Sequence, residues 1–184
     1  MQDHATNWPG VIIRCMANEL YFPMITREAL ARIDSRRLGR SLMGSIARRA
    51  HRARFGYTVC IQKPSGNHGS LQGEEIVNGW ANIAIRVSEA DACNPAAGSP
   101  TAIKWNPNLI MGDGGERPPF IALAHELVHA MNNLRGTAFA DNRIEEMKTV
   151  GLGEHAHDRK RNENTIRAEH GLGARDRYTG LYEP

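Results

Sequence analysis

The segment LAHELVHAMNNLRG, residues 123–136, decides the fold of this chain. Its apolar residues cover nearly every side of a helix drawn through it, which indicates a helix that is buried all round. Pro119 suits the first turn of this helix and Gly136 suits its C-terminal end. The sequence therefore predicts a fully buried helix from Pro119 to about Leu134.

Within this helix, residues 125–129 read His-Glu-Leu-Val-His. Residues four apart on a helix are separated by only about 40° around its axis, so the imidazoles of His125 and His129 can reach one metal ion. Zinc accepts neutral imidazole ligands, and Glu126 can take the proton of a water molecule that the metal activates. A pair of hydrogen-bonded core histidines is the alternative, but a metal would satisfy all three buried polar groups at once. The motif predicts a catalytic zinc site.

Such a site needs a third protein ligand, and the residues alone leave its identity open. A helix beginning near residue 141 could present one of two adjacent carboxylates to the metal. His155 and His157 are most simply explained as surface histidines. The downstream candidates are Glu145, Glu146, His155, His157 and His170.

Strands are expected mainly in the first half of the chain and helices in the second. Apolar and β-branched residues predict strands near 11–15, 57–61, 82–87 and 101–105. Further helices are predicted over 27–50, 141–150 and 159–170, the first with Thr26 as its N-cap and a division at Gly39 or Gly44. Loops or turns are predicted at 63–73, 88–100 and 111–119. No linker or repeat is visible, so we expect one α+β domain over residues 1–184, with a small mixed sheet packed on the buried helix.

Composition limits the classes of partner. The net charge of +3 is too small to indicate nucleic acid by itself. Nine arginines and no lysine lie between Arg27 and Arg54. A solvated helix face explains most such runs of arginine. The alternatives are a docking surface for an acidic partner and a surface that binds nucleic acid. Nucleic acid is disfavoured because the run lacks interleaved aromatic residues. We expect a monomer that binds no nucleic acid.

The three cysteines, Cys15, Cys60 and Cys93, show neither disulfide nor zinc-finger spacing, and reduced thiols are expected. No apolar run approaches the roughly 20 residues that a membrane span needs. The N-terminus, MQDHATNWPG, has no basic segment followed by an apolar one. We therefore predict a soluble protein without a signal peptide or a membrane span.

Four segments taken together resemble the zinc proteases of clostridial neurotoxins. Residues 123–136 are similar to the zinc helix of their light chains, and LGRSLMGSIAR (38–48) is similar to another of their helices. IEEMKTVG (144–151) resembles their Glu-Glu-x-x-Thr-x-Gly segment, whose second Glu is the third zinc ligand, which implies this role for Glu146. ARDRY (174–178) resembles their Arg-x-x-Tyr pair, which stabilises the transition state.

This last likeness implies that Arg175 and Tyr178 donate hydrogen bonds to the tetrahedral oxyanion, a role that their guanidinium and phenol groups suit. Glu163 lies twelve residues before Arg175, as does a supporting carboxylate of the light chains, which implies that it orients Arg175 or the helix of Glu146. The chain looks still more like compact type III effector metallopeptidases of the NleD and HopH kind. This resemblance covers residues 38–178.

The resemblance implies a zincin-like fold, secretion by a bacterium into the cytoplasm of a host cell, and cleavage of a host protein, with stress-activated MAP kinases as the family's substrates. In zincins the edge strand before the zinc helix pairs with substrate, so Trp105 and Asn106 could line the cleft, although packing would also explain the Trp. We therefore expect a zinc endopeptidase with Zn2+ on His125, His129 and Glu146. The alternative is a non-catalytic basic interaction module whose structural zinc site is closed by protein.

Overall fold

The computed structural model describes residues 1–53, 56–64, 82–112, 115–156 and 161–178, and its largest sheet has five strands. Their order is β1-β2-β3-β5-β4. The central strands β2, β3 and β5 are parallel, while β1 and β4 pair antiparallel at the two edges. The strand bounds are Gln2–Ala5 for β1, Val11–Cys15 for β2, Val59–Gln62 for β3, Ile83–Arg86 for β4 and Thr101–Lys104 for β5.

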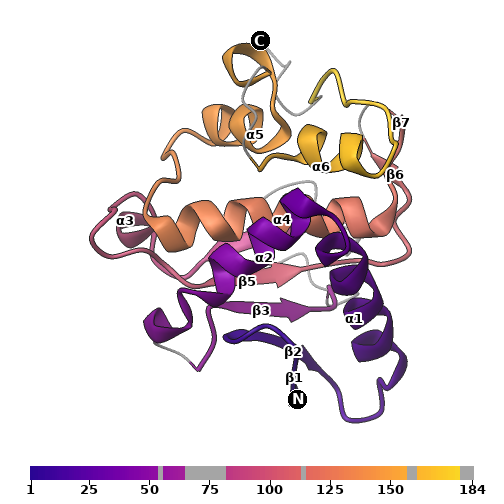
Figure 1. The fold of residues 1–184 in the computed structure, drawn as a ribbon. Coiled ribbons are helices and arrows are strands. Elements are labelled where there is room, and N and C mark those ends of the chain that lie inside the picture. The colour runs from indigo at the N-terminus through magenta and orange to yellow at the C-terminus, as the bar shows by residue number, and fades with distance from the viewer. Residues whose placement is uncertain (54–55, 65–81, 113–114, 157–160, 179–184) are drawn as a thin grey trace.

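Helix α4 is the centre of the fold. Figure 1 shows it between the sheet and the C-terminal helices α5 and α6, with α1 and α2 alongside. The bounds are Tyr21–Asp34 for α1, Arg37–Ala47 for α2, Glu89–Ala92 for α3, Pro119–Arg135 for α4, Asn142–Val150 for α5 and Glu163–Glu169 for α6. Short elements are the 3-10 turns Ala50–Arg52 and Gly153–His155 and the hairpin of β6, Met111–Gly112, with β7, Gly115–Glu116.

The core lies between one face of the sheet and these helices. Ile13, Ile61 and Ile103 are register partners on β2, β3 and β5, and all three are fully buried. Every residue of α4 from Phe120 to Leu134 is buried. The structure therefore confirms the α+β class, the small mixed sheet and the buried helix. No helix in the described part of the chain is long and apolar enough to span a membrane.

The predicted helix 27–50 differs from the two helices observed. Helix α1 begins at Tyr21, so Thr26 is not an N-cap; it is buried within the helix and its hydroxyl donates to the Phe22 carbonyl at 2.7 Å. The break falls at residues 35–36, before both predicted glycines. Gly39 has a packing role instead, because a Cβ there would lie 1.8 Å from the Ile33 carbonyl oxygen.

Other differences are smaller. Strand β1 was not predicted, and α3 and the β6–β7 hairpin lie in segments expected to be loops or turns. Helix α6 begins at Glu163 because the Asn162 side chain accepts from the Thr165 amide and caps it. The predicted segments at 65–73 and 157–160 lie outside the described residues. Cys15, Cys60 and Cys93 are all free thiols, as expected.

Gly136 ends α4 where the sequence predicted, with a left-handed φ of +68°. A Cβ there would lie 1.9 Å from the backbone oxygen of Asn94. We expect Gly136→Ala to lower the free energy of unfolding by about 3 kcal/mol, about 1 kcal/mol from the left-handed backbone and the rest from displacing Asn94. Chemical denaturation of the two proteins measures the difference.

Gly171 provides the matched control. Its φ is +70°, and a Cβ there would meet nothing within 4 Å. Gly171→Ala should therefore cost only the backbone strain, about 1 kcal/mol. Equal losses for the two variants would contradict the close approach of α4 to Asn94.

Candidate active site

Helix α4 brings two imidazoles together. His125 and His129 occupy successive turns, and their Nε2 atoms face each other at 3.1 Å. Both residues are buried, with ring centroids 4.8 Å apart. The spacing of four residues on α4 therefore brings the two Nε2 atoms close enough to bind one ion, as expected from the sequence.

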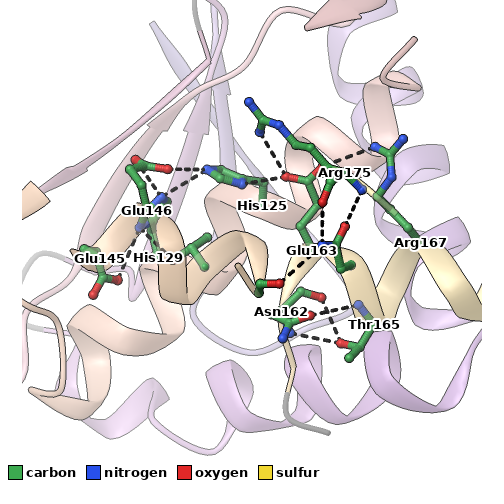
Figure 2. Close-up of polar contacts among 12 residues, drawn as sticks. His125, His129, Glu145, Glu146, Asn162, Glu163, Thr165, Arg167 and Arg175 are labelled. Carbon is green, nitrogen blue, oxygen red and sulfur yellow. Dashed lines mark hydrogen bonds and ion pairs between the residues drawn. The ribbon is translucent and has the colours of Figure 1, made fainter. Parts of the chain in front are cut away.

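The third group comes from α5. Asp141 caps this helix by accepting from the Ile144 amide, and Glu146, which follows the first turn, points toward the histidines. Its Oε2 lies 3.1 Å from His125 Nε2 and its Oε1 lies 3.2 Å from His129 Nε2. Figure 2 shows the three side chains converging. Among the described residues, these three form the one group whose ligand atoms lie close enough, within 4.8 Å of one another, to share a metal.

The other nitrogen of each imidazole contacts a carboxylate. His125 Nδ1 lies 2.9 Å from Glu163 Oε2, and His129 Nδ1 lies 3.3 Å from Glu145 Oε1. The Thr149 hydroxyl is also 3.3 Å from His129 Nδ1. Because a carboxylate accepts the proton of Nδ1, it fixes the tautomer that leaves Nε2 as a lone pair. Both imidazoles are thus prepared to bind a cation.

The arrangement fits a metal ion better than it fits hydrogen bonding alone. With both imidazoles neutral and donating from Nδ1, the two Nε2 lone pairs would face each other at 3.1 Å, so a positive charge is required between them. The buried Glu146 Oε2 makes no hydrogen bond in the described part of the chain and has only its ion-pair contact with His125 Nε2 at 3.1 Å. Ligand atoms about 2.1 Å from a tetrahedral zinc ion are about 3.3 Å apart, close to the spacings here. A cation would satisfy all three groups.

The charged groups of the site shift one another's pKa values. Burial lowers the pKa of His129, but Glu146 and Glu145 outweigh it and raise the value to about 10. Burial raises the pKa of Glu163, but the hydrogen bond with His125 outweighs it and lowers the value to about 2. Glu126 behaves differently, because burial raises its pKa although both histidines lower it. A carboxyl with a raised pKa suits a group that takes up a proton and returns it.

These groups line a cleft of about 210 Å3. Glu126 on α4, which is 3% exposed, lines the same cleft. Strand β4, one of the two edge strands of the described sheet, forms one side of the cleft. Two cations, Arg86 and Arg117, lie on its wall. The lining residues are Asn82, Ile83, Ala84, Arg86, Arg117, His125, Glu126, His129, Asn133, Asn142, Glu145, Glu146 and Tyr178.

The strand that lines the cleft is not the one that sequence reasoning chose. Trp105 follows β5, is 1% exposed, and donates from Nε1 to the Pro119 carbonyl at 3.0 Å. The Asn106 amide bonds to Asn82 Oδ1 at 2.7 Å. Neither residue lines the cleft, because β5 is an inner strand and β4 covers its outer side.

The C-terminal segment returns to the site. The Tyr178 ring stacks near the His125 ring, with centroids 6.4 Å apart and planes 14° apart, and it lines the cleft. Arg175 is 5% exposed, and its guanidinium lies over the Tyr178 ring, with the guanidinium carbon 4.6 Å from the ring centre and Nη1 3.4 Å from Glu163 Oε2. The structure thus brings Tyr178 to the cleft and places Arg175 against Glu163 instead.

The remaining candidates take other positions. Glu145 is buried but faces Nδ1 of His129, and it accepts from Asn132 at 2.8 Å and from the Phe139 amide at 2.9 Å. His155 lies 3.5 Å from Glu154, and His170 packs edge-on against Phe120. His157 lies outside the described residues.

Several contacts of the site were not predicted. Glu163 was expected to orient Arg175 or the helix of Glu146, but it also bonds to His125 and accepts from Arg167 at 3.2 Å. Thr149 lies in the segment that resembles the light chains, but the contact of its hydroxyl with His129 was not expected. Arg117 precedes α4 in a segment expected to be a turn, and no spacing connects it with the motif. Of these two residues, only Thr149 could have been found from the sequence, because only Thr149 lies in a segment that resembles the light chains.

The site first defines a class of protein: an α+β chain with a candidate metal centre made of two imidazoles from the buried helix α4 and one carboxylate from α5. The chain belongs to the peptidase family M91 of effector proteins, whose family model matches residues 16–178. This match confirms the resemblance to NleD-like effector peptidases. It implies a peptidase that is secreted into a host and acts on a host protein. The comparison with curated proteins found no match.

Proposed function

We propose that the protein is a zinc-dependent endopeptidase with a zincin-like catalytic domain over residues 1–184. The observation that carries the proposal is the convergence of His125, His129 and Glu146 beside the buried carboxyl of Glu126 in an open cleft. Three protein ligands with an open position define a catalytic zinc site rather than a structural one. Zinc bound there would supply Lewis-acid activation of water and of the peptide carbonyl.

Glu126 is the proposed general base. It follows His125 on α4 and lines the same cleft, so it lies beside any water molecule held at the histidine cluster. Its carboxyl takes a proton from the attacking water and then delivers it to the leaving amine. The raised pKa that burial gives this carboxyl suits both steps.

Tyr178 is the proposed oxyanion donor. Its ring lies over His125 on the wall of the cleft, where its hydroxyl can donate to the tetrahedral oxygen. We propose that Arg175, first expected to donate as well, supports the ring of Tyr178 in the free enzyme. Glu163 then has two functions, since it orients both His125 and Arg175.

The alternative, a basic interaction module with a structural zinc site, is supported less well. A structural site closes its fourth position with a protein side chain, and no fourth ligand accompanies the three groups in the described residues. A structural site also has no use for Glu126 in the cleft. We further propose that the enzyme acts as a monomer in the host cytoplasm, with a MAP kinase as one candidate substrate suggested by the family resemblance.

Cleavage of host-cell proteins tests the proposed activity directly. Zinc-loaded protein is incubated with host-cell lysate, with and without a zinc chelator, and new N-termini are mapped. We expect new termini that disappear with chelator and return when zinc is restored. Purified protein that contains zinc but creates no chelator-sensitive termini in several host lysates would favour the interaction module.

Tyr178→Phe tests the oxyanion donor. The ring remains, so its stacking on His125 and contact with Arg175 are kept, but the donor is lost. We expect unchanged zinc content, similar KM and a kcat about 10²-fold lower, the scale for one oxyanion donor. Steady-state kinetics on the mapped substrate measure this effect. An unchanged kcat would remove Tyr178 from the catalytic set.

A further inference from the structure

A second cavity, of about 540 Å3, lies beside α4 and away from the cleft. Val128, Met131 and Arg135 line it and recur at helical spacing, on a different face of α4 from His125 and His129. The other walls come from α2, α5 and the start of α6. The volume is in the range of sites that bind a ligand or a peptide side chain.

Three cations from separate segments reach this cavity: Arg135 at the end of α4, Lys148 on α5 and Arg161 before α6. Arg161 Nη1 donates to the uncharged Ser41, at 3.1 Å to its carbonyl and 3.3 Å to its hydroxyl. None of the described lining residues is acidic. The wall therefore carries a concentrated positive charge.

Neighbouring arginines extend this positive charge. Burial, and then the charges of Arg135, Arg48 and Arg49, lower the pKa of Arg161. Arg48 and Arg49 belong to the arginine-rich segment noted in the sequence. Like charges held this close are stabilised when an anion binds between them.

The buried part of the cavity lining combines aliphatic and amide groups. Val128 and Met131 from α4 are 2% and 5% exposed, Leu38 from α2 adds partly exposed aliphatic surface, and the buried Asn132 and Asn162 also line the cavity. A concave site that combines cations with aliphatic surface suits a flexible segment that carries carboxylates beside an aliphatic side chain. A flat membrane surface would not reach these buried residues, and a simple inorganic anion would leave the aliphatic ones uncovered.

We propose that this cavity is an exosite that binds an acidic segment of the protein substrate, with carboxylates on Arg135, Lys148 and Arg161 and an aliphatic side chain on Leu38, Val128 and Met131. This inference rests on the proposed peptidase function. Because α4 forms a wall of both the exosite and the cleft, one rigid element would hold the substrate at two points. Binding at the exosite raises the effective concentration of the scissile segment at the cleft.

The two sites also share a structural connection. Asn132 lines the exosite and donates to Glu145 at 2.8 Å, and Glu145 lies 3.3 Å from His129 Nδ1. The position of the exosite wall is thus fixed relative to the metal site. The exosite need not move to serve the cleft.

Peptide binding tests the exosite without requiring catalysis. The protein is the full chain, zinc-loaded and carrying Glu126→Gln so that the probe is not cleaved. The probe is the fluorescein-labelled peptide Glu-Glu-Leu-Glu-Glu-Leu, and its matched control has Gln at every Glu. We expect saturable binding of the acidic peptide by fluorescence anisotropy, weakened by salt, and weak or no binding of the Gln peptide.

Arginine variants locate the binding. Arg135→Gln should weaken the acidic peptide on the order of tenfold, as expected for losing one partly buried charge partner. Arg135 also lies in the last turn of α4, where a cation stabilises the helix, so Arg161→Gln is measured beside it. Arg27→Gln on α1 is the matched control, since Arg27 is exposed and its guanidinium bonds to the Ala5 carbonyl. Its affinity should stay within about twofold of the parent.

Three results would overturn the exosite. Equal affinity for the acidic and Gln peptides would remove the charge recognition, and unchanged binding in both cavity variants would place the peptide elsewhere. Displacement by inorganic tripolyphosphate or phosphatidylserine vesicles at lower concentrations than by unlabelled peptide would assign a phosphate ligand or a membrane instead. Chelator-sensitive cleavage is measured in a separate experiment. If the peptide does not bind at the cavity, the peptidase proposal still stands; if no cleavage is found, peptide binding can still be measured.

Discussion

Glu126→Gln is expected to abolish most of the turnover while leaving the metal in place. Glutamine has nearly the same shape as glutamate, so the 3% exposed site on α4 is filled without a cavity. It cannot take a proton from water, and losing a general base lowers kcat by about 10²–10⁴-fold. Single-turnover cleavage of the mapped substrate, with zinc content measured on the same sample, gives both quantities.

Glu28→Gln is the matched control for this substitution. Glu28 is exposed on α1, and the same chemical change there should leave kcat and zinc content unchanged. Turnover close to that of the unmodified protein in Glu126→Gln would assign the base elsewhere. Loss of zinc in that variant would instead make Glu126 a ligand.

The second large effect is expected at Glu146, the proposed third ligand. Glu146→Ala removes the carboxylate whose two oxygens lie 3.1 Å and 3.2 Å from the histidine Nε2 atoms. Only two ligands remain, so we expect zinc to be lost during purification and activity with it. The variant should also lose the stabilisation by zinc, because a ligand that binds only the folded state adds stability by mass action.

Glu145→Gln distinguishes the two neighbouring glutamates. Glu145 faces His129 Nδ1, so its loss should weaken zinc about 10–100-fold without emptying the site at saturating metal. Zinc titration by calorimetry, and Tm measured with and without chelator, compare the variants. A larger loss of zinc affinity in Glu145→Gln than in Glu146→Ala would reverse the assignment of the ligand.

Local patterns predicted the parts of the molecule that depend on local chemistry. The buried helix follows from apolar residues on all its faces, and its end follows from a glycine in a left-handed conformation at Gly136. His125 and His129 meet because helix geometry alone places them together. The choice of Glu146 over Glu145 needed the family resemblance. Neighbouring residues on a helix point in different directions, and the sequence alone does not show which of them faces the histidines.

Features that depend on distant contacts could not be predicted in this way. The break between α1 and α2 depends on the close approach of Gly39 to Ile33, which no periodicity reveals. Trp105 was expected in the cleft on the assumption that its strand lies at the edge of the sheet. That edge is formed by β4 instead, which pairs antiparallel with β5. Arg175 was expected in the cleft, but it contacts Glu163 and its guanidinium lies over the Tyr178 ring.

The three candidate ligands lie between residues 125 and 146, whereas Glu163 and Tyr178 come from the last part of the described chain. Short loops close faster and at lower entropic cost than long ones, so the ligand set can assemble before the C-terminal segment docks. If the proposed roles hold, binding of the metal and gain of catalytic activity are expected to be separate steps of folding. A refolding chain should acquire zinc first and proteolytic activity later, when Glu163 locks His125 and Tyr178 reaches the cleft.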